Sequence, residues 1–244
     1  MSEYINADCM DYLPSYADGE FDLAIVDPPY GGGAVDDADD AFRGAVVGRF
    51  GGRFAKYELG GAPEIKAART GGNWWTRYQI NGGTFDRDIR HWDVAPSREY
   101  FEQLFRVSKN QIIWGGNYFD LPPTRCFIVW RKSQIPLEGF TMSALEYAWT
   151  SFNQNARMYV CPSNATSTNQ RIHPTQKPVE LYKWLLENFA EPGMRILDTH
   201  VGSASSLIAC ERLGFEYTGF EVYKTYYDMS RERMDRELAQ LTLF

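Results

Sequence analysis

Short apolar runs alternate with segments of helical periodicity along most of the chain. Residues 21–26 are apolar and lead into Asp27-Pro28-Pro29, where the prolines predict the end of a strand because they lack amide donors. Phe101, Leu104 and Phe105 have the spacing of a helix. Further strands are expected near 4–6, 111–114, 126–130, 145–150, 195–197 and 216–220, and helices at 179–189, 203–213 and 225–241.

This alternation predicts an α/β fold, a doubly wound, Rossmann-like sheet of about seven strands, mostly parallel, with helices on both faces. Residues 1–30 and 91–244 are expected to form this domain, with 153–173 as a polar loop. Residues 31–90 are too long for an ordinary loop and are rich in Gly, Arg and aromatic residues. They are expected to be an insertion, or alternatively a disordered excursion.

Charge is spread unevenly over the 244 residues. The formal net charge is −7, yet residues 41–90 hold seven Arg and two Lys against four acids, a balance of +5 that leaves −12 for the rest. Such a basic segment can bind a polyanion even when the body is acidic. The candidate contacts in it are Arg43, Arg49, Arg53, Lys56 and Arg77.

Composition excludes several classes of protein. No apolar run approaches the roughly 20 residues that span a bilayer, so no membrane segment is expected. The N-terminus has no basic stretch followed by an apolar core, which predicts a cytoplasmic protein. The four cysteines have no metal-ligand spacing, so no metal site is expected and the thiols are expected to be buried and reduced.

The strand-ending sequence Asp27-Pro28-Pro29-Tyr30 is the first candidate site. An exocyclic amine on a nucleobase is a poor nucleophile, because its lone pair is conjugated into the ring. A carboxylate beside a backbone carbonyl can accept both amine hydrogens and direct the lone pair outward. A following aromatic side chain can stack on a base that has left the duplex. The alternative interpretation is an ordinary turn.

A second candidate is the strand–turn–helix sequence from Ile196 to Ser206. Gly202 allows close approach to the backbone, and a helix N-terminus favours a negatively charged group. Glu221 follows 19 residues after Gly202, an offset at which an acid can accept ribose hydroxyls. A single glycine favours a smaller adenosine cofactor over a dinucleotide, although an ordinary strand–helix turn has the same pattern. A third motif is the sequence 173–178, His-Pro-Thr-Gln-Lys-Pro, whose alternative is a loop before a helix.

Together the three motifs resemble the permuted beta group of DNA amino-methyltransferases, the adenine-N6 and cytosine-N4 methylases, and especially the compact adenine methylases of phages and prophages. In that group the catalytic Asp-Pro-Pro-Tyr comes first and the cofactor turn last, a circularly permuted order that this chain shares. The likeness extends through residues 6–10, 106–119, 127–132 and 146–152. The chain departs from the group's common cofactor turn, with Thr199-His200 in place of Pro-Phe and Ala204 in place of a glycine.

The resemblance implies S-adenosylmethionine as the cofactor and DNA as the substrate. It assigns the flipped target base to Asp27, Pro28, Pro29 and Tyr30. It assigns the cofactor to Asp8, Cys9, Asp27, Thr175, Lys177, Asp198, His200, Gly202, Ser203 and Glu221. Because the stretch after residue 152 is short for target recognition, the insertion 31–90 is expected to read the DNA sequence.

The expected activity is direct in-line methylation of adenine N6 in DNA, as in restriction-modification systems, and a homodimer is one possible assembly. A cytosine-N4 methylase is the nearest alternative, but the group's cytosine enzymes more often carry Ser where this chain has Asp27. A catalytically silent DNA- or protein-binding module is the second. A nuclease is the third, because Glu64-Ile65-Lys66 matches half of a common nuclease pattern.

Overall fold

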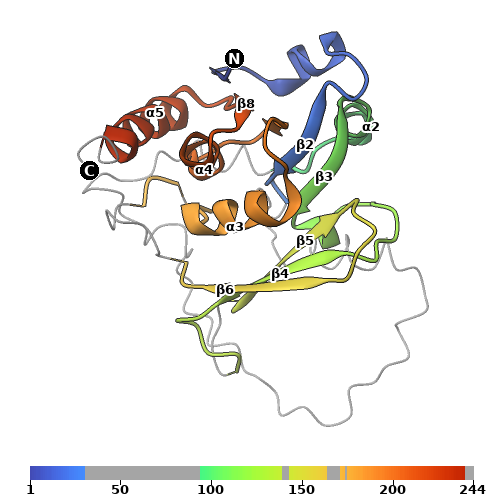
Figure 1. Ribbon diagram of the computed structural model, residues 1–244, viewed down its shortest axis with the longest axis vertical. Coiled ribbons are helices and arrows are strands. Elements are labelled where there is room, and N and C mark those ends of the chain that lie inside the picture. Colours follow the sequence, from blue (N-terminus) through green and yellow to red (C-terminus); the bar gives the residue numbers. More distant parts are fainter. Residues whose placement is uncertain (31–93, 139–142, 164–170, 174, 240–244) are drawn as a thin grey trace. The chain divides into compact units, whose positions relative to one another are not determined.

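The computed structural model describes residues 1–30, 94–138, 143–163, 171–173 and 175–239. The chain divides into two units, Met1–Pro28 with Pro96–Phe244, and Pro29–Ala95. Almost all of the described residues belong to the first unit (Figure 1). The predicted DNA contacts Arg43, Arg49, Arg53, Lys56 and Arg77, and the nuclease-like Glu64-Ile65-Lys66, lie outside the described residues.

One eight-stranded sheet forms the centre of the first unit, in the order β1-β8-β7-β2-β3-β5-β4-β6. Five of the neighbouring pairs are parallel, and β5 alone runs antiparallel to both of its neighbours in the described sheet. The strands are Glu3–Ile5 (β1), Phe21–Val26 (β2), Ser108–Trp114 (β3), Phe127–Lys132 (β4), Leu145–Thr150 (β5), Arg157–Cys161 (β6), Arg195–Asp198 (β7) and Glu216–Phe220 (β8).

Helices cover both faces of this sheet, as the doubly wound pattern predicts (Figure 1). The α-helices are Arg98–Val107 (α2), Val179–Phe189 (α3), Ser205–Leu213 (α4) and Lys224–Ala239 (α5). Short 3-10 turns lie at Cys9–Asp11 (η1), Leu13–Ser15 (η2) and Gly116–Tyr118 (η5).

Alternation along β2 divides the core into two parts. Leu23 and Ile25 belong to the cluster that includes α3 and α4, whereas Ala24 and Val26 belong to the cluster that includes α2. Because successive side chains of a strand point to opposite faces, a central strand covered on both sides is apolar throughout. The apolar run at 21–26 therefore reflects a strand buried on both faces.

Three element predictions were wrong in detail. The stretch 153–173, predicted as loop, contains β6, an edge strand. Its exposed positions hold the apolar Met158 and Val160, so apolar and polar residues do not alternate along its sequence. The sheet thus has eight strands instead of about seven. Strand β3 begins at Ser108, directly after α2, and α4 begins at Ser205, after the positive φ angles of Gly202 and Ala204 interrupt helical geometry.

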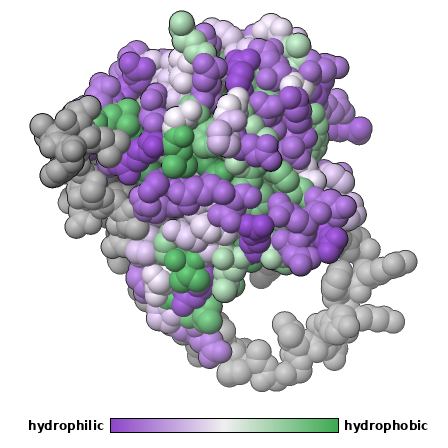
Figure 2. Space-filling view, in the orientation of Figure 1, coloured by the Kyte–Doolittle hydropathy of each residue, from purple (hydrophilic) through white to green (hydrophobic). Residues whose placement is uncertain are grey.

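The surface of the face that carries α3, α4 and α5 is mostly hydrophilic, with small separate apolar patches (Figure 2). None of the helices in the described ranges is long and apolar enough to cross a bilayer. All four cysteines are buried and none forms a disulfide, which confirms the expectation of buried, reduced thiols.

Candidate active site

The two main candidate motifs lie on neighbouring strands. Strand β2 pairs in parallel with β7, with Leu23 opposite Ile196 and Ala24 opposite Leu197. Asp27 follows β2 and Asp198 ends β7, so both lie at the carboxyl edge of the sheet. From β2 the sheet continues to β3 on one side and to β7 and β8 on the other. Open α/β sheets bind ligands at such a reversal of strand order.

The turn after β7 is organised from within by Asp198. Its carboxylate accepts the backbone amide of His200 at 3.0 Å and the Ser206 hydroxyl. Burial raises the Asp198 pKa to about 7, although these two hydrogen bonds act to lower it. Asp198 therefore shapes the turn, which fits its predicted membership of a cofactor turn.

Left-handed backbone gives this turn its shape. Gly202 has φ +54° and Ala204 has φ 60°, and Ala204 is the one non-glycine residue with positive φ in the described ranges. The position where the resemblance led us to expect glycine is thus occupied by alanine in a glycine-like conformation, at a cost of about 1–2 kcal/mol. Arg233 of α5 stabilises the turn by donating to the Ser203 carbonyl at 2.6 Å.

Glu221 comes to the same place from the end of β8. It is 7% exposed, and its two carboxylate oxygens accept the amides of Gly202 and Tyr223, each at 2.9 Å. Burial raises its pKa, and the two amides act to lower it. The predicted ribose acid is therefore in contact with the predicted cofactor turn.

Residues after β1 complete this edge of the sheet. The Asp8 carboxylate caps η1 by accepting the Met10 amide at 2.9 Å. Burial raises the pKa of the neighbouring Cys9 thiol to about 12, so this thiol is neutral at physiological pH. Strand β1 pairs with β8, which brings Asp8 and Cys9 toward the Glu221 side of the edge.

A hydrogen-bonded pair of side chains connects α2 with the turn. The Tyr100 hydroxyl lies 2.6 Å from Thr199 Oγ1, which lies 2.9 Å from His200 Nδ1. Burial lowers the His200 pKa to about 4, with the Asp8 charge acting in the opposite direction. His200 is therefore a neutral ring at the edge of the turn.

The third motif packs against the same turn. The His173 ring lies 4.4 Å from the Tyr226 ring and 3.5 Å from the point where a Cβ on Gly202 would stand. Thr175 Oγ1 lies 3.1 Å from His173 Nδ1, so Thr175 engages this histidine. The Lys177 carbonyl accepts the Ser205 hydroxyl at 2.6 Å, which ties the motif to the start of α4.

Asp27 belongs to a largely buried cluster of four charged side chains. The Lys177 ammonium pairs with Asp27 Oδ2 and lies 3.3 Å from Glu146 Oε2, while Lys132 Nζ lies 2.5 Å from Glu146 Oε1. Burial acts to raise the Glu146 pKa, but Lys177 and Lys132 outweigh it and the pKa lies below its ordinary value. The cluster alternates negative and positive charges across four elements.

The predicted residues of the first unit thus gather at one edge of the sheet, while Pro29 and Tyr30 belong to the second unit. Glu146, Lys132 and Arg233 escaped the sequence-based prediction. A signal existed for two of them, because Glu146 shares a strand face with Ala148 and Thr150, and Lys132 shares one with Trp130 and Ile128. Charged residues in phase with buried ones on paired strands indicate an internal ion pair.

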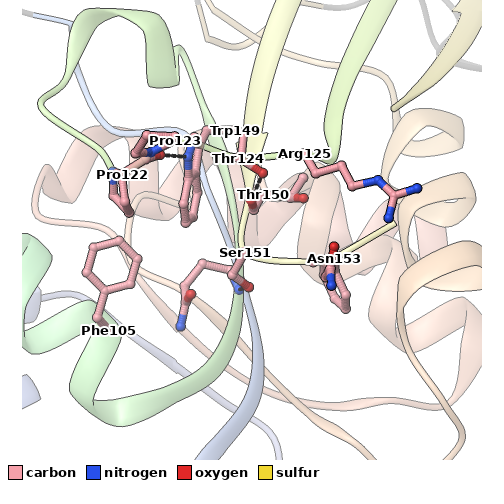
Figure 3. Close-up of a pocket in the computed structure, with 11 residues that line it drawn as sticks. Phe105, Pro122, Pro123, Thr124, Arg125, Trp149, Thr150, Ser151 and Asn153 are labelled. Atoms are coloured by element: carbon pink, nitrogen blue, oxygen red, sulfur yellow. Dashed lines mark hydrogen bonds between the residues drawn. The ribbon is translucent and has the colours of Figure 1, made fainter. Parts of the chain in front are cut away.

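A separate hollow of about 530 Å³ lies away from this edge, toward the amino end of β3 (Figure 3). Phe105, Pro122, Pro123 and Trp149 line one part of it, and the Arg125 side chain extends away from them. None of the predicted site residues lines it. In the described part of the chain, no group of three or more His, Cys, Asp and Glu residues is arranged to hold a metal ion.

Part of the chain, which includes the turn after β7 and the 173–178 motif, is similar to known proteins. Residues 129–232 match the N6_N4_Mtase family, described as DNA methylase. The type II methyltransferase M.HpaI of Haemophilus parainfluenzae is 36% identical over 69 residues, 28% of this chain and 22% of that protein. M2.DpnII of Streptococcus pneumoniae is 35% identical over 65 residues, 27% of this chain and 24% of that protein. The matched stretch spans about a quarter of these relatives' length.

Solved structures show the same fold at low sequence identity. The M1.HpyAVI–SAM complex aligns over 96% of this chain and 100% of its own, with a TM-score of 0.52 and 16% identity. PvuII DNA methyltransferase, a cytosine-N4-specific enzyme, aligns over 96% of this chain and 90% of its own, with a TM-score of 0.51 and 13% identity. Residues 129–232 are thus similar to the DNA methylase family, and the sheet has the fold of solved DNA methyltransferases.

Proposed function

We propose that this protein transfers a methyl group from S-adenosylmethionine to the N6 amino group of adenine in DNA. The observation that carries the proposal is the juxtaposition of two motifs remote in sequence. Asp27 directly follows β2, and the turn 198–205 follows from the end of the adjacent β7. Lys177 contacts both, through its ammonium with Asp27 and through its carbonyl with Ser205. A methyl donor held at the turn would thus lie next to the acceptors that hold the amine.

The residues at the turn fit an adenosine cofactor. Each Glu221 oxygen accepts one backbone amide, and an ionised carboxylate offers about four acceptor sites, which leaves capacity for two ribose hydroxyls. Residues 202–204 precede α4, whose N-terminus favours a carboxylate. When bound, S-adenosylmethionine supplies an electrophilic methyl group on a sulfonium. The resemblance also assigns cofactor binding to Asp8, Cys9, Thr175 and His200, and we retain these residues as proposed cofactor contacts.

The chain's own contribution to the chemistry is the positioning of the amine. Asp27 and the Pro28 carbonyl accept the two N6 hydrogens, which draws the nitrogen lone pair out of conjugation and toward the methyl group. The rigid Pro28-Pro29 backbone fixes the relative direction of the two acceptors. Most of the rate enhancement then comes from orientation and preorganised electrostatics, with no covalent enzyme intermediate.

Asp27 supports adenine over cytosine as the target base, because the cytosine-N4 enzymes of the group that this chain resembles more often have Ser at that position. Tyr30 is proposed to stack on the flipped base, and the basic residues within 31–90 to contact DNA. These two assignments rest on the sequence. Nucleoside analysis of methylated DNA tests the base directly, and N4-methylcytosine as the product would refute the adenine assignment.

Replacement of Asp27 tests the mechanism. Asp27→Ala is expected to abolish methyl transfer from labelled cofactor while cofactor affinity stays within about tenfold, roughly 1.4 kcal/mol. Asp228→Ala is the matched control, because Asp228 is an exposed acid of α5 that pairs with Lys224. Wild-type turnover in Asp27→Ala would remove Asp27 from the mechanism. Absence of methyl transfer to any DNA by the wild type would favour a silent binding module.

A further inference from the structure

Lys177 is a buried ammonium whose polar contacts are made within the protein. Its side chain is 3% exposed. It pairs with Asp27 Oδ2, lies 3.3 Å from Glu146 Oε2, and lies 5.1 Å from the centre of the Trp114 ring. Two carboxylates and an aromatic face thus surround the three donors of this ammonium. The ammonium is therefore oriented toward the Asp27 carboxylate.

Glu146 contacts Lys177 directly, and Lys132 contacts Glu146. Glu146 bridges the two lysines, with one oxygen toward each, and Lys132 also lies 5.2 Å from the Trp130 ring. Glu146 stands opposite Trp130 on the antiparallel pair β4–β5, so two hydrogen-bonded strands fix its position. The alternation of two acids and two bases leaves the cluster without net charge, which reduces the cost of burying it.

The main chain of Lys177 is fixed independently of its ammonium. Ser205 donates to the Lys177 carbonyl at 2.6 Å and itself lies 2.9 Å from Arg233 Nη1. The same Arg233 nitrogen donates to Ser203 in the turn. The residue that contacts Asp27 is therefore anchored at its backbone by the cofactor turn and at its tip by Glu146.

We propose that Lys177 is a positioning residue that orients the Asp27 carboxylate toward the target amine, with Glu146 and Lys132 holding Lys177 in place. The inference rests on the proposed methyl transfer. It also replaces the role that the resemblance implied for Lys177, a contact with the cofactor, because the ammonium donors already face Asp27 and Glu146. An ammonium that donates to one oxygen of a carboxylate restricts the rotation of that group and so fixes the direction of its other oxygen.

The first test separates positioning from cofactor binding. Lys177→Met is expected to lower kcat at saturating cofactor at least 100-fold, while the cofactor Kd from calorimetry changes less than threefold. Lys183→Met is the matched control, since Lys183 lies in α3 and pairs with Glu180, outside the cluster. Unchanged kcat with a Kd weakened 100-fold would overturn the inference and make Lys177 a cofactor ligand. Glu146→Gln, expected to lower kcat about tenfold, serves if Lys177→Met does not fold.

The second test needs no activity and so distinguishes failure of this inference from failure of the proposed function. Burial acts to lower the Lys177 pKa, but Asp27 and Glu146 outweigh it and the pKa lies above its ordinary value, with His173 as the other titratable neighbour. Nitrogen-15 NMR of the lysine ammonium groups should show this pKa falling by at least one unit in Asp27→Asn and in Glu146→Gln. Unchanged Lys177 titration in both variants would overturn the inference, whether or not the wild type methylates DNA.

Discussion

The buried ring of His173 should lower the free energy of unfolding as the pH falls, and a single substitution of this histidine should remove its share of that pH dependence. His173 packs on Tyr226 and beside Gly202, and its Nδ1 accepts from Thr175. Burial, followed by the nearby positive charge of Lys177, lowers its pKa from 6.5 to about 3. The unfolded chain therefore takes up a proton near pH 6.5, whereas the folded protein resists protonation until near pH 3.

The sign of the effect follows from this difference. A histidine whose pKa is depressed in the folded state stabilises the fold fully above the unfolded pKa and loses that stabilisation as the pH falls. The slope is about half of 1.36 kcal/mol per pH unit at pH 6.5 and approaches that full value at lower pH, so His173 alone costs about 2.3 kcal/mol between pH 6.5 and 4.5. His200, with a pKa of about 4, adds a similar slope. Asp198, with its pKa raised to about 7, contributes the opposite slope over the same range.

His173→Asn isolates the contribution of this ring. Asparagine places a carbonyl oxygen near the position of Nδ1, so the contact with Thr175 is retained, but it takes up no proton. Urea unfolding at pH 6.5, 5.5 and 4.5 should show the wild type losing about 2.3 kcal/mol relative to the variant across this range. A stability difference that stays constant from pH 6.5 to 4.5 would refute the reasoning, because it would mean that the folded ring protonates as readily as the unfolded one.

Three further substitutions test the turn and its supports. Gly202→Ala should lower the free energy of unfolding by about 1–2 kcal/mol, because φ is +54°, whereas a Cβ would have room at 3.5 Å from His173. A larger loss in urea titration would contradict the space available for this Cβ. Arg233→Met should cost about 2–3 kcal/mol and weaken cofactor binding in calorimetry, because it removes the hydrogen bond to Ser203, and unchanged cofactor affinity would deny that Arg233 supports the turn. Tyr100→Phe should cost about 1 kcal/mol in thermal unfolding through the lost contact with Thr199, and an unshifted melting temperature would count against that hydrogen bond.

Local sequence patterns predicted most strands of the sheet and the position of the carboxyl end of β2. The run at 21–26 and the prolines after it located β2 and its end, because a strand buried on both faces is apolar and proline cannot continue the ladder. Strand β6 was missed, since an edge strand that exposes Met158 and Val160 carries no periodic signal. Patterning reports burial and is weak where burial is incomplete.

The candidate site was predictable where a motif is contiguous and unpredictable where it is assembled from distant segments. Asp27 and Glu221 each stand at the end of an apolar run, so their positions at the strand ends could be inferred. The pairing of Lys177 with Asp27 could not, because it depends on β5 and β4 bringing Glu146 and Lys132 to the same side. Nor could the left-handed conformation of Ala204, which the surrounding packing imposes against the preference of the residue itself.

The strand order has a consequence for synthesis on the ribosome. Tyr4 of β1 pairs with Gly219 of β8, and the central strand β2 pairs with β7, so strands made early wait for partners made near the end. A nascent chain that has emerged only as far as β6 has Asp27 and Lys132 but no turn to accompany them. Loop closure over such separations is slow, and the unpaired sides of β1 and β2 stay open to incorrect pairing in the meantime. Translation stalled before residue 195 should therefore leave an aggregation-prone chain. Release of the full chain allows β7 to pair with β2 and β8 to pair with β1.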